Sequence, residues 1–174
     1  VLHRDHSSIT GIVAHMESVA VGPLIMAETE ALSKLKEQPE RPFIAIVGGA
    51  KVSDKLKVLE SLMTRVDTII VGGAMAYTFL ASKGHEVGNS LVEPDRFNVA
   101  QKIISRCSQR GVELILPIDH VVAETISSEP STVTYIPSDK SAYDIGPESI
   151  ELFSKAISKA KTIFWNGPMG MTEV

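Results

Sequence analysis

The chain has 174 residues, of which 44% are hydrophobic and 22% charged, as is typical of a globular α/β protein with one sizeable core. Its formal net charge of -4 argues against nucleic-acid binding, and no apolar run approaches the roughly 20 residues that span a bilayer, so we expect neither nucleic-acid nor membrane partners. Cys107 is the only cysteine, which excludes an intramolecular disulfide, fits a reducing compartment and predicts a cytoplasmic location.

The first 22 residues show no clear periodicity, although Ile12 and Val13 predict a short strand. His3, Arg4 and His6 crowd the start of this segment and could bind an anion or, less readily, a metal ion. The alternative is an exposed, poorly ordered terminus. Because the chain does not begin with methionine, two origins stay open: an excised fragment, or a chain that has lost its initiator methionine.

A helix is predicted over residues 23–36, because Pro23 suits the first helical position and apolar residues recur at helical spacing. The apolar stripe consists of Leu24, Ala27, Ala31, Leu32 and Leu35. Pro39 and Pro42 lie beyond the helix and indicate a connector to the rest of the chain.

From Phe43 onward, predicted strands and helices alternate. The strands are Phe43–Val47, Thr68–Val71, Glu113–Pro117, a fourth at His120–Ala123, and Lys161–Trp165, and the helices are Asp54–Arg65, Met75–Lys83, Arg96–Arg110 and Pro147–Ala160. Repeated strand–helix units predict a parallel sheet with helices on both faces. We expect Trp165 at a strand end in the core, Cys107 on a buried helix face, and Ile150, Phe153 and Ile157 on one face of the last helix.

The stretch around Gly48-Gly49 is the strongest candidate for a binding site. A buried strand ends at these glycines and is followed by Lys51 and Lys55, which would share one face at the start of a helix. Glycines admit backbone N–H groups to an anion, and the helix dipole disfavours lysines there unless an anion is present. The alternative is a tight turn with two solvated lysines.

Two further strands end in similar small residues. The segment IVGGA occurs twice, at 46–50 and at 70–74, and the last strand runs into Asn166-Gly167-Pro168. Ligands of open α/β sheets bind at the carboxyl ends of the strands, so three such turns predict one shared crevice. The usual phosphate-loop and G-x-G-x-x-G patterns are both absent, and no G-x-S-x-G nucleophile appears.

Six longer motifs carry a resemblance to a known family. They are HRDHSS (3–8), RPFIAIVGGAKVSDK (41–55), IIVGGAMAYTFL (69–80), GHEVGNSL (84–91), DIGPES (144–149) and WNGPMG (165–170). In order and spacing they resemble phosphoglycerate kinase along essentially the whole chain. The resemblance implies a three-layer αβα, Rossmann-like parallel sheet that is incomplete at its C-terminal end. It also implies that residues 1–22 are the tail of an N-terminal substrate domain, 23–42 an interdomain helix and connector, and 43–174 a truncated nucleotide-binding domain.

The resemblance further implies reversible phosphoryl transfer from 1,3-bisphosphoglycerate to ADP, giving 3-phosphoglycerate and ATP with Mg²⁺. Lys51 matches the lysine that follows the transferred phosphoryl group, and Arg4, with His3 beside it, matches the contact to phosphoglycerate. The matched nucleotide-binding positions are Gly49, Lys55, Gly72, Gly73, Asn166, Pro168 and Glu173. Phosphoryl transfer depends on positioning and charge neutralisation, which lysines and arginine provide. Considered without the resemblance, Glu173 would be a surface carboxylate.

Several departures from the family pattern are visible. Ala74 and Ala142 replace small turn residues beside the adenine, and Thr172 stands where an aromatic residue is usual. The family's G-G-G-D-[S/T] motif and most of its N-terminal domain are missing from this segment, so we assign no magnesium ligand. We expect the segment to be part of a longer, monomeric enzyme and to be inactive by itself. Two other functions stay open: a stand-alone nucleotide- or anion-binding module, and a Rossmann-type dehydrogenase domain.

Overall fold

The computed structural model describes residues 11–37 and 39–172. The chain forms two compact units, residues 1–39 and 40–174. No helix within the described ranges combines the length and apolar character needed to cross a bilayer.

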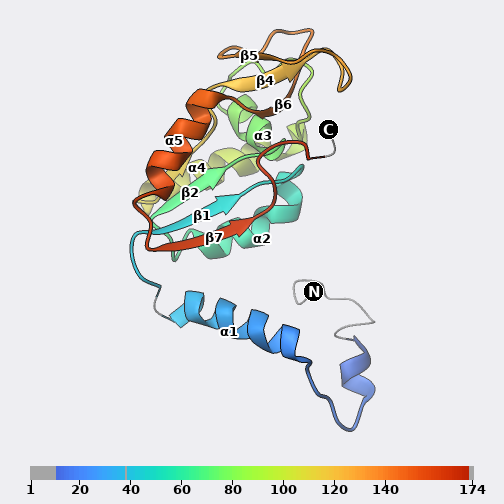
Figure 1. Ribbon diagram of the computed structural model, residues 1–174, viewed down its shortest axis with the longest axis vertical. Coiled ribbons are helices and arrows are strands. Elements are labelled where there is room, and N and C mark those ends of the chain that lie inside the picture. The colour runs from blue at the N-terminus through green and yellow to red at the C-terminus, as the bar shows by residue number, and fades with distance from the viewer. Residues whose placement is uncertain (1–10, 38, 173–174) are drawn as a thin grey trace. The chain divides into compact units, whose positions relative to one another are not determined.

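The first unit contains a short 3₁₀ helix, η2 (Ile12–His15), and the helix α1 (Pro23–Glu37) (Figure 1). The strand expected at Ile12 and Val13 is therefore wrong. Met16 N–H donates to the carbonyl of Val13 at 3.3 Å, so a local turn satisfies backbone groups that a strand would have to pair with a neighbour. The helix predicted from Pro23 is confirmed and begins at that residue.

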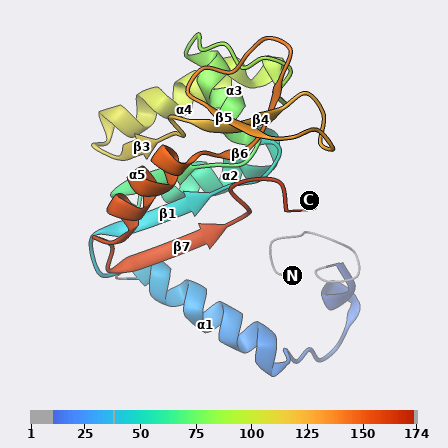
Figure 2. The ribbon, with the colours of Figure 1, turned by 45° about the horizontal axis from the view of Figure 1, so that its top comes forward.

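The second unit is organised around a four-stranded parallel sheet in the order β3-β2-β1-β7 (Figures 1 and 2). The strands are β1 (Phe43–Val47), β2 (Thr68–Val71), β3 (Glu113–Ile115) and β7 (Thr162–Asn166). The first strand in the chain lies inside the sheet, between β2 and β7, and all five of its residues are buried. An unbroken apolar run is what a strand covered on both faces requires.

Helices cover both faces of this sheet, which confirms the predicted three-layer arrangement. On one face, α5 (Pro147–Ile157) places Phe153 against Ile44, Ile46 and Ile70. On the other, α2 (Val52–Leu62) contacts β1, α4 (Phe97–Gln109) contacts β3, and α3 (Met75–Ser82) packs against α4. A short 3₁₀ turn, η3 (Pro94–Arg96), leads into α4.

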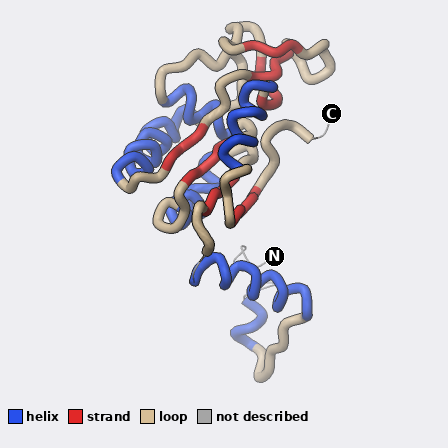
Figure 3. The backbone as a smooth tube through the Cα atoms, turned by 60° about the vertical axis from the view of Figure 1, so that its left-hand side comes forward, coloured by secondary structure: helices blue, strands red, loops and turns tan. Residues whose placement is uncertain are grey.

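A second sheet was not expected from the sequence. It is antiparallel, in the order β5-β4-β6, and consists of β4 (His120–Ala123), β5 (Ser131–Val133) and β6 (Ser141–Ile145) (Figure 3). The strand predicted at 120–123 exists but belongs to this sheet rather than to the parallel one. Only residues 116–119 separate β3 from β4, and a parallel crossover needs about a dozen residues or more.

Asp119 ties this second sheet to α5. Its carboxylate accepts the backbone N–H groups of Glu148 at 2.9 Å and Ser149 at 2.7 Å, and the Ser149 hydroxyl at 2.6 Å. Partial desolvation acts to raise the pKa of Asp119, but these hydrogen bonds outweigh it and hold the pKa below its ordinary value. A carboxylate at a helix N-terminus also complements the helix dipole, so Asp119 fixes where α5 begins.

The burial expected from the sequence is wrong for Trp165 and Ile150 and confirmed for Phe153 and Cys107. Trp165 is 61% exposed rather than in the core, because β7 is an edge strand of the described sheet. Ile150 is 53% exposed, whereas Phe153 and its neighbours on α5 face the sheet. Cys107 is buried on α4 as predicted.

Candidate functional site

Three turns meet at the carboxyl ends of β1, β2 and β7. Gly48 N–H donates to the carbonyl of Asn166 at 2.9 Å, and Gly49 N–H to that of Pro168 at 3.1 Å. Gly73 N–H donates to the carbonyl of Met169 at 2.7 Å. Because neighbouring parallel strands end at the same sheet edge, segments more than 90 residues apart in the chain form one continuous backbone surface.

Glycine is required for this close packing of turns. Gly73 has φ +66°, and a Cβ added there would lie 2.6 Å from both the nitrogen and the carbonyl oxygen of Gly49. A Cβ on Gly48 would overlap the carbonyl oxygen of Pro168. Side chains at these positions would force the three turns apart.

The expected use of these glycines needs correction. The N–H groups of Gly48, Gly49, Gly72 and Gly73 all donate to backbone carbonyl oxygens, so they stabilise the turns and are not left to bind an anion. The double glycines serve turn packing, and anion binding has to come from side chains or from the remaining amides of this surface.

The start of α2 also differs from expectation. The helix begins at Val52, and Lys51 is its extended N-cap residue (φ −123°, ψ 133°), so Lys51 and Lys55 do not share a helical face. Ser53 donates its N–H to Glu93 Oε2 at 3.1 Å and its hydroxyl to Glu93 Oε1 at 2.6 Å. The Glu93 carboxylate therefore occupies the helix N-terminus that was expected to attract phosphate.

The pKa of Glu93 reflects this position. Partial burial acts to raise it, but hydrogen bonds from the Ser53 hydroxyl and from the backbone of Ser53 and Val52, together with the charge of Arg96, lower it below the ordinary glutamate value. Glu93 was missed from the sequence because no local pattern links it to Ser53, 40 residues earlier. Its only signal was its place just after the GHEVGNSL motif.

The two candidate lysines have different environments. Lys55 is half-buried, and its Nζ donates to Oδ1 of Asn166, so it joins α2 to the end of β7. Lys51 is exposed and extended at the mouth of the turn after β1. The structure thus brings Lys55, Asn166 and Gly49 together and leaves Lys51 beside them with its charge open to solvent.

A cavity of about 390 Å³ adjoins the three turns. Gly49, Gly73 and Pro168 line it, as do the three positions that depart from the family pattern, Ala74, Ala142 and Thr172. Tyr143, which follows Ala142 in the chain, also lines it. Sequence reasoning missed the other lining residues, which are Ala50, Asn89, Leu91, Ser141, Gly170 and Met171. None of the lining side chains is charged, so this cavity suits the less polar part of a ligand, and Lys51 and Lys55 lie outside it.

The other predicted site residues do not line this cavity or lie outside the described residues. Gly72 does not line the cavity, and a Cβ added there would overlap the Met169 side chain. His3, Arg4 and Glu173 fall outside the described residues. Within the described part of the chain, no three His, Cys, Asp or Glu side chains converge on a point that could hold a metal ion. These residues do not form a magnesium site by themselves.

Known proteins resemble this chain along its whole length. The sequence model of the phosphoglycerate kinase family matches residues 1–174. The phosphoglycerate kinase of Acidobacterium capsulatum is 46% identical over 177 residues, covering 99% of this chain and 44% of its own length. That of Clostridium botulinum is 46% identical over 174 residues, covering 98% of this chain and 44% of its own length.

Solved structures agree with this. The phosphoglycerate kinase of Coxiella burnetii superposes with a TM-score of 0.85 at 39% identity, over 88% of this chain and 40% of its own. The enzyme from Pyrococcus horikoshii gives a TM-score of 0.75 at 28% identity, over 86% of this chain and 39% of its own. This chain spans 44% of the length of the curated relatives above. On this combination of fold and sequence match, the chain belongs to the phosphoglycerate kinase family.

Proposed function

We propose that this chain supplies the nucleotide-binding half of an enzyme that transfers a phosphoryl group between 1,3-bisphosphoglycerate and ADP, giving 3-phosphoglycerate and ATP. The proposal is supported by the family membership and by relatives that are themselves named phosphoglycerate kinase. Because the chain spans 44% of those relatives, the activity is assigned to a longer protein of which this segment is part.

The observation that carries this proposal is the junction of Lys55 with Asn166 beside the three packed turns. An ammonium group anchored at the carboxyl ends of two adjacent parallel strands is a fixed positive charge for the phosphates of ADP. The neighbouring uncharged cavity of about 390 Å³ has room for the adenine and ribose. Lys51, exposed at the mouth, has the reach to accompany the transferred phosphoryl group.

Charge neutralisation is the chemical task of these lysines. The transferred phosphoryl group carries negative charge on its oxygens, and stabilising that charge lowers the barrier without a covalent protein intermediate. We assign Arg4 and His3 to phosphoglycerate and Glu173 to the ribose hydroxyls. Mg²⁺ enters with the nucleotide, and its protein ligands lie outside the residues assigned here. The full enzyme is proposed to be a cytoplasmic monomer.

Calorimetric titration of ADP, with and without Mg²⁺, tests the nucleotide site. Lys55→Ala should raise the Kd about tenfold, since it removes a charge-assisted contact worth about 1.4 kcal/mol. Lys57→Ala is the matched control, because Lys57 is exposed on the same helix and carries the same charge. Equal affinity in Lys55→Ala and wild type would contradict the assignment.

Turnover separates the kinase from a stand-alone binding module. We expect the purified 174-residue chain to bind ADP but to show no phosphoryl transfer in a coupled assay, because most of the substrate half is absent. Turnover at the rate of a full-length relative would contradict this. The dehydrogenase alternative would be favoured if NAD bound tightly and ADP did not compete with it for the site.

A further inference from the structure

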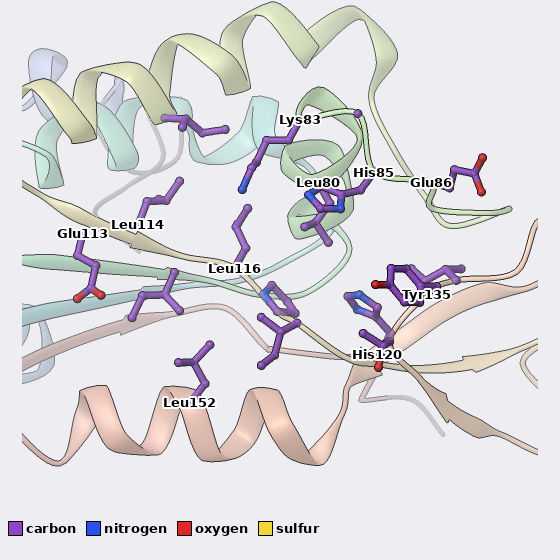
Figure 4. Close-up of a pocket in the computed structure, with 17 residues that line it drawn as sticks. Leu80, Lys83, His85, Glu86, Glu113, Leu114, Leu116, His120, Tyr135 and Leu152 are labelled. Carbon is purple, nitrogen blue, oxygen red and sulfur yellow. The ribbon is translucent and has the colours of Figure 1, made fainter.

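A second and larger cavity lies away from the three turns. It has a volume of about 790 Å³ and shares no lining residue with the nucleotide cavity. It is bounded by the end of α3, the outer edge of β3, the start of β4 and the segment after β5 (Figure 4). A volume in this range accommodates a small organic molecule.

Part of the lining of this cavity is apolar. Leu80, Leu114, Leu116, Ile136 and Leu152 all line it, and they come from α3, from β3 and its continuation, from the segment after β5 and from α5. Leu80 and Ile136 are almost fully buried. A ligand seated here would therefore place a hydrocarbon portion against leucine and isoleucine side chains.

His120 provides a buried polar group in the same cavity. The residue is 5% exposed, and its Nδ1 has no hydrogen-bond partner among the described residues. Its ring packs edge-on against Tyr77, with centroids 5.4 Å apart. Burial lowers the pKa of His120, which outweighs the opposing effect of Asp119, and His85 lowers it further. A neutral imidazole keeps one N–H donor and one acceptor, and leaving either unpaired in the interior is costly.

The polar side chains that line the cavity are of both kinds: Lys83 and the histidines can donate hydrogen bonds, and Glu86 and Glu113 are carboxylates. Figure 4 shows Lys83 reaching from the end of α3 toward Leu116 and His85 lying beside Leu80, while the carboxylate of Glu86 turns away. Neither Lys83 nor His85 forms an ion pair within the described residues. Glu113 lies at the far end, where its carboxylate accepts a hydrogen bond from Thr68 at 3.3 Å.

We propose that this cavity binds a small amphipathic carboxylate, with its hydrocarbon part against Leu114, Leu116 and Leu152 and its carboxylate between Lys83 and the two histidines. The Lys83 ammonium and the imidazole N–H groups are hydrogen-bond donors that one carboxylate can accept from. The site is separate from the proposed nucleotide site, so the two can be tested independently.

The test uses octanoate as the probe and octanamide as its uncharged counterpart. Each is titrated into the ¹⁵N-labelled chain, and binding is followed by amide chemical shifts. Octanoate should shift the amides of Lys83, His85, Leu116 and His120, and octanamide should bind several-fold more weakly. Lys83→Met removes the charge but keeps the apolar stem, and it should weaken octanoate about threefold to fivefold.

Lys102→Met is the matched control, because Lys102 is exposed on α4 and does not line the cavity. It should leave octanoate binding unchanged, and Lys83→Met should leave ADP binding unchanged. The proposal is overturned if octanoate shifts no cavity amide, if octanamide binds equally well, or if both lysine variants weaken octanoate alike.

Discussion

The carboxylate of Glu93 is predicted to set the stability of the turn that carries Lys51. It accepts hydrogen bonds from the N–H and hydroxyl of Ser53 at the first turn of α2, and its own N–H donates to the Thr78 hydroxyl at 3.1 Å. Glu93 therefore joins the loop before η3 to both α2 and α3. Glu93→Ala removes the acceptor altogether, whereas Glu93→Gln keeps an acceptor oxygen and removes the charge.

The expected magnitude follows from these contacts. Loss of a helix N-terminal cap costs roughly 0.5–2 kcal/mol, and hydrogen bonds to a charged group contribute about 1.5–3 kcal/mol when buried. Because Glu93 is only partly buried, we expect about 2 kcal/mol for Glu93→Ala and about 1 kcal/mol for Glu93→Gln at neutral pH. Exposed Glu124, converted to Gln, is the control and should change the free energy of unfolding by less than about 0.5 kcal/mol.

The pH dependence has a definite sign. Since the folded state lowers the pKa of Glu93, its stabilisation is present above the unfolded pKa and is lost as the pH falls through the folded pKa. The difference between wild type and Glu93→Gln should therefore narrow once the pH drops below about 4.3, the ordinary glutamate value.

Urea unfolding followed by circular dichroism measures these free energies. Equal stability of Glu93→Gln and wild type at neutral pH would refute the capping role. A difference that grew as the pH was lowered would refute the stated direction of the pKa shift.

Three further predictions concern the turns, the second sheet and the edge strand. Gly73→Ala should lower the free energy of unfolding by roughly 2 kcal/mol or more, because the added methyl meets the Gly49 backbone. Gly84 is also at positive φ but has open space around it, so Gly84→Ala should cost only about 1 kcal/mol in the same urea experiment. Asp119→Asn should lower the free energy of unfolding by about 2–3 kcal/mol at neutral pH. This difference from wild type should diminish as the pH falls through the lowered pKa of Asp119, which thermal unfolding at several pH values checks. Trp165, the only tryptophan, should show the fluorescence of a water-exposed indole, and a spectrum typical of a buried indole would contradict its placement. Because Trp165 directly precedes Asn166, ADP should change the fluorescence intensity.

The central sheet was predictable because its signals are local. Phe43–Val47 is a continuous apolar run, and every residue in it is buried. Gly84 and Gly111, which follow α3 and α4, have positive φ, as glycines that end helices commonly do. Each of these features is decided by residues within a few positions of one another.

The features that the sequence did not predict depend on distant partners. The assignment of β4 to a second sheet follows from β5 and β6 pairing with it, and β6 carries no clear alternation. The exposure of Trp165 follows from the position of β7 at a sheet edge. The meeting of the three turns at one sheet edge was predicted, but the hydrogen bonds of their glycines were not, because the N–H partners belong to other segments of the chain.

The most direct test of the nucleotide site is a map of amide chemical shifts on adding ADP with Mg²⁺ to the ¹⁵N-labelled chain. We expect the largest changes at Gly49, Ala74 and Met171, which line the cavity beside the three turns, with smaller changes at His120. Saturable binding with its largest shifts around His120, or no saturable shifts at all, would contradict the placement of the nucleotide at the carboxyl ends of β1, β2 and β7.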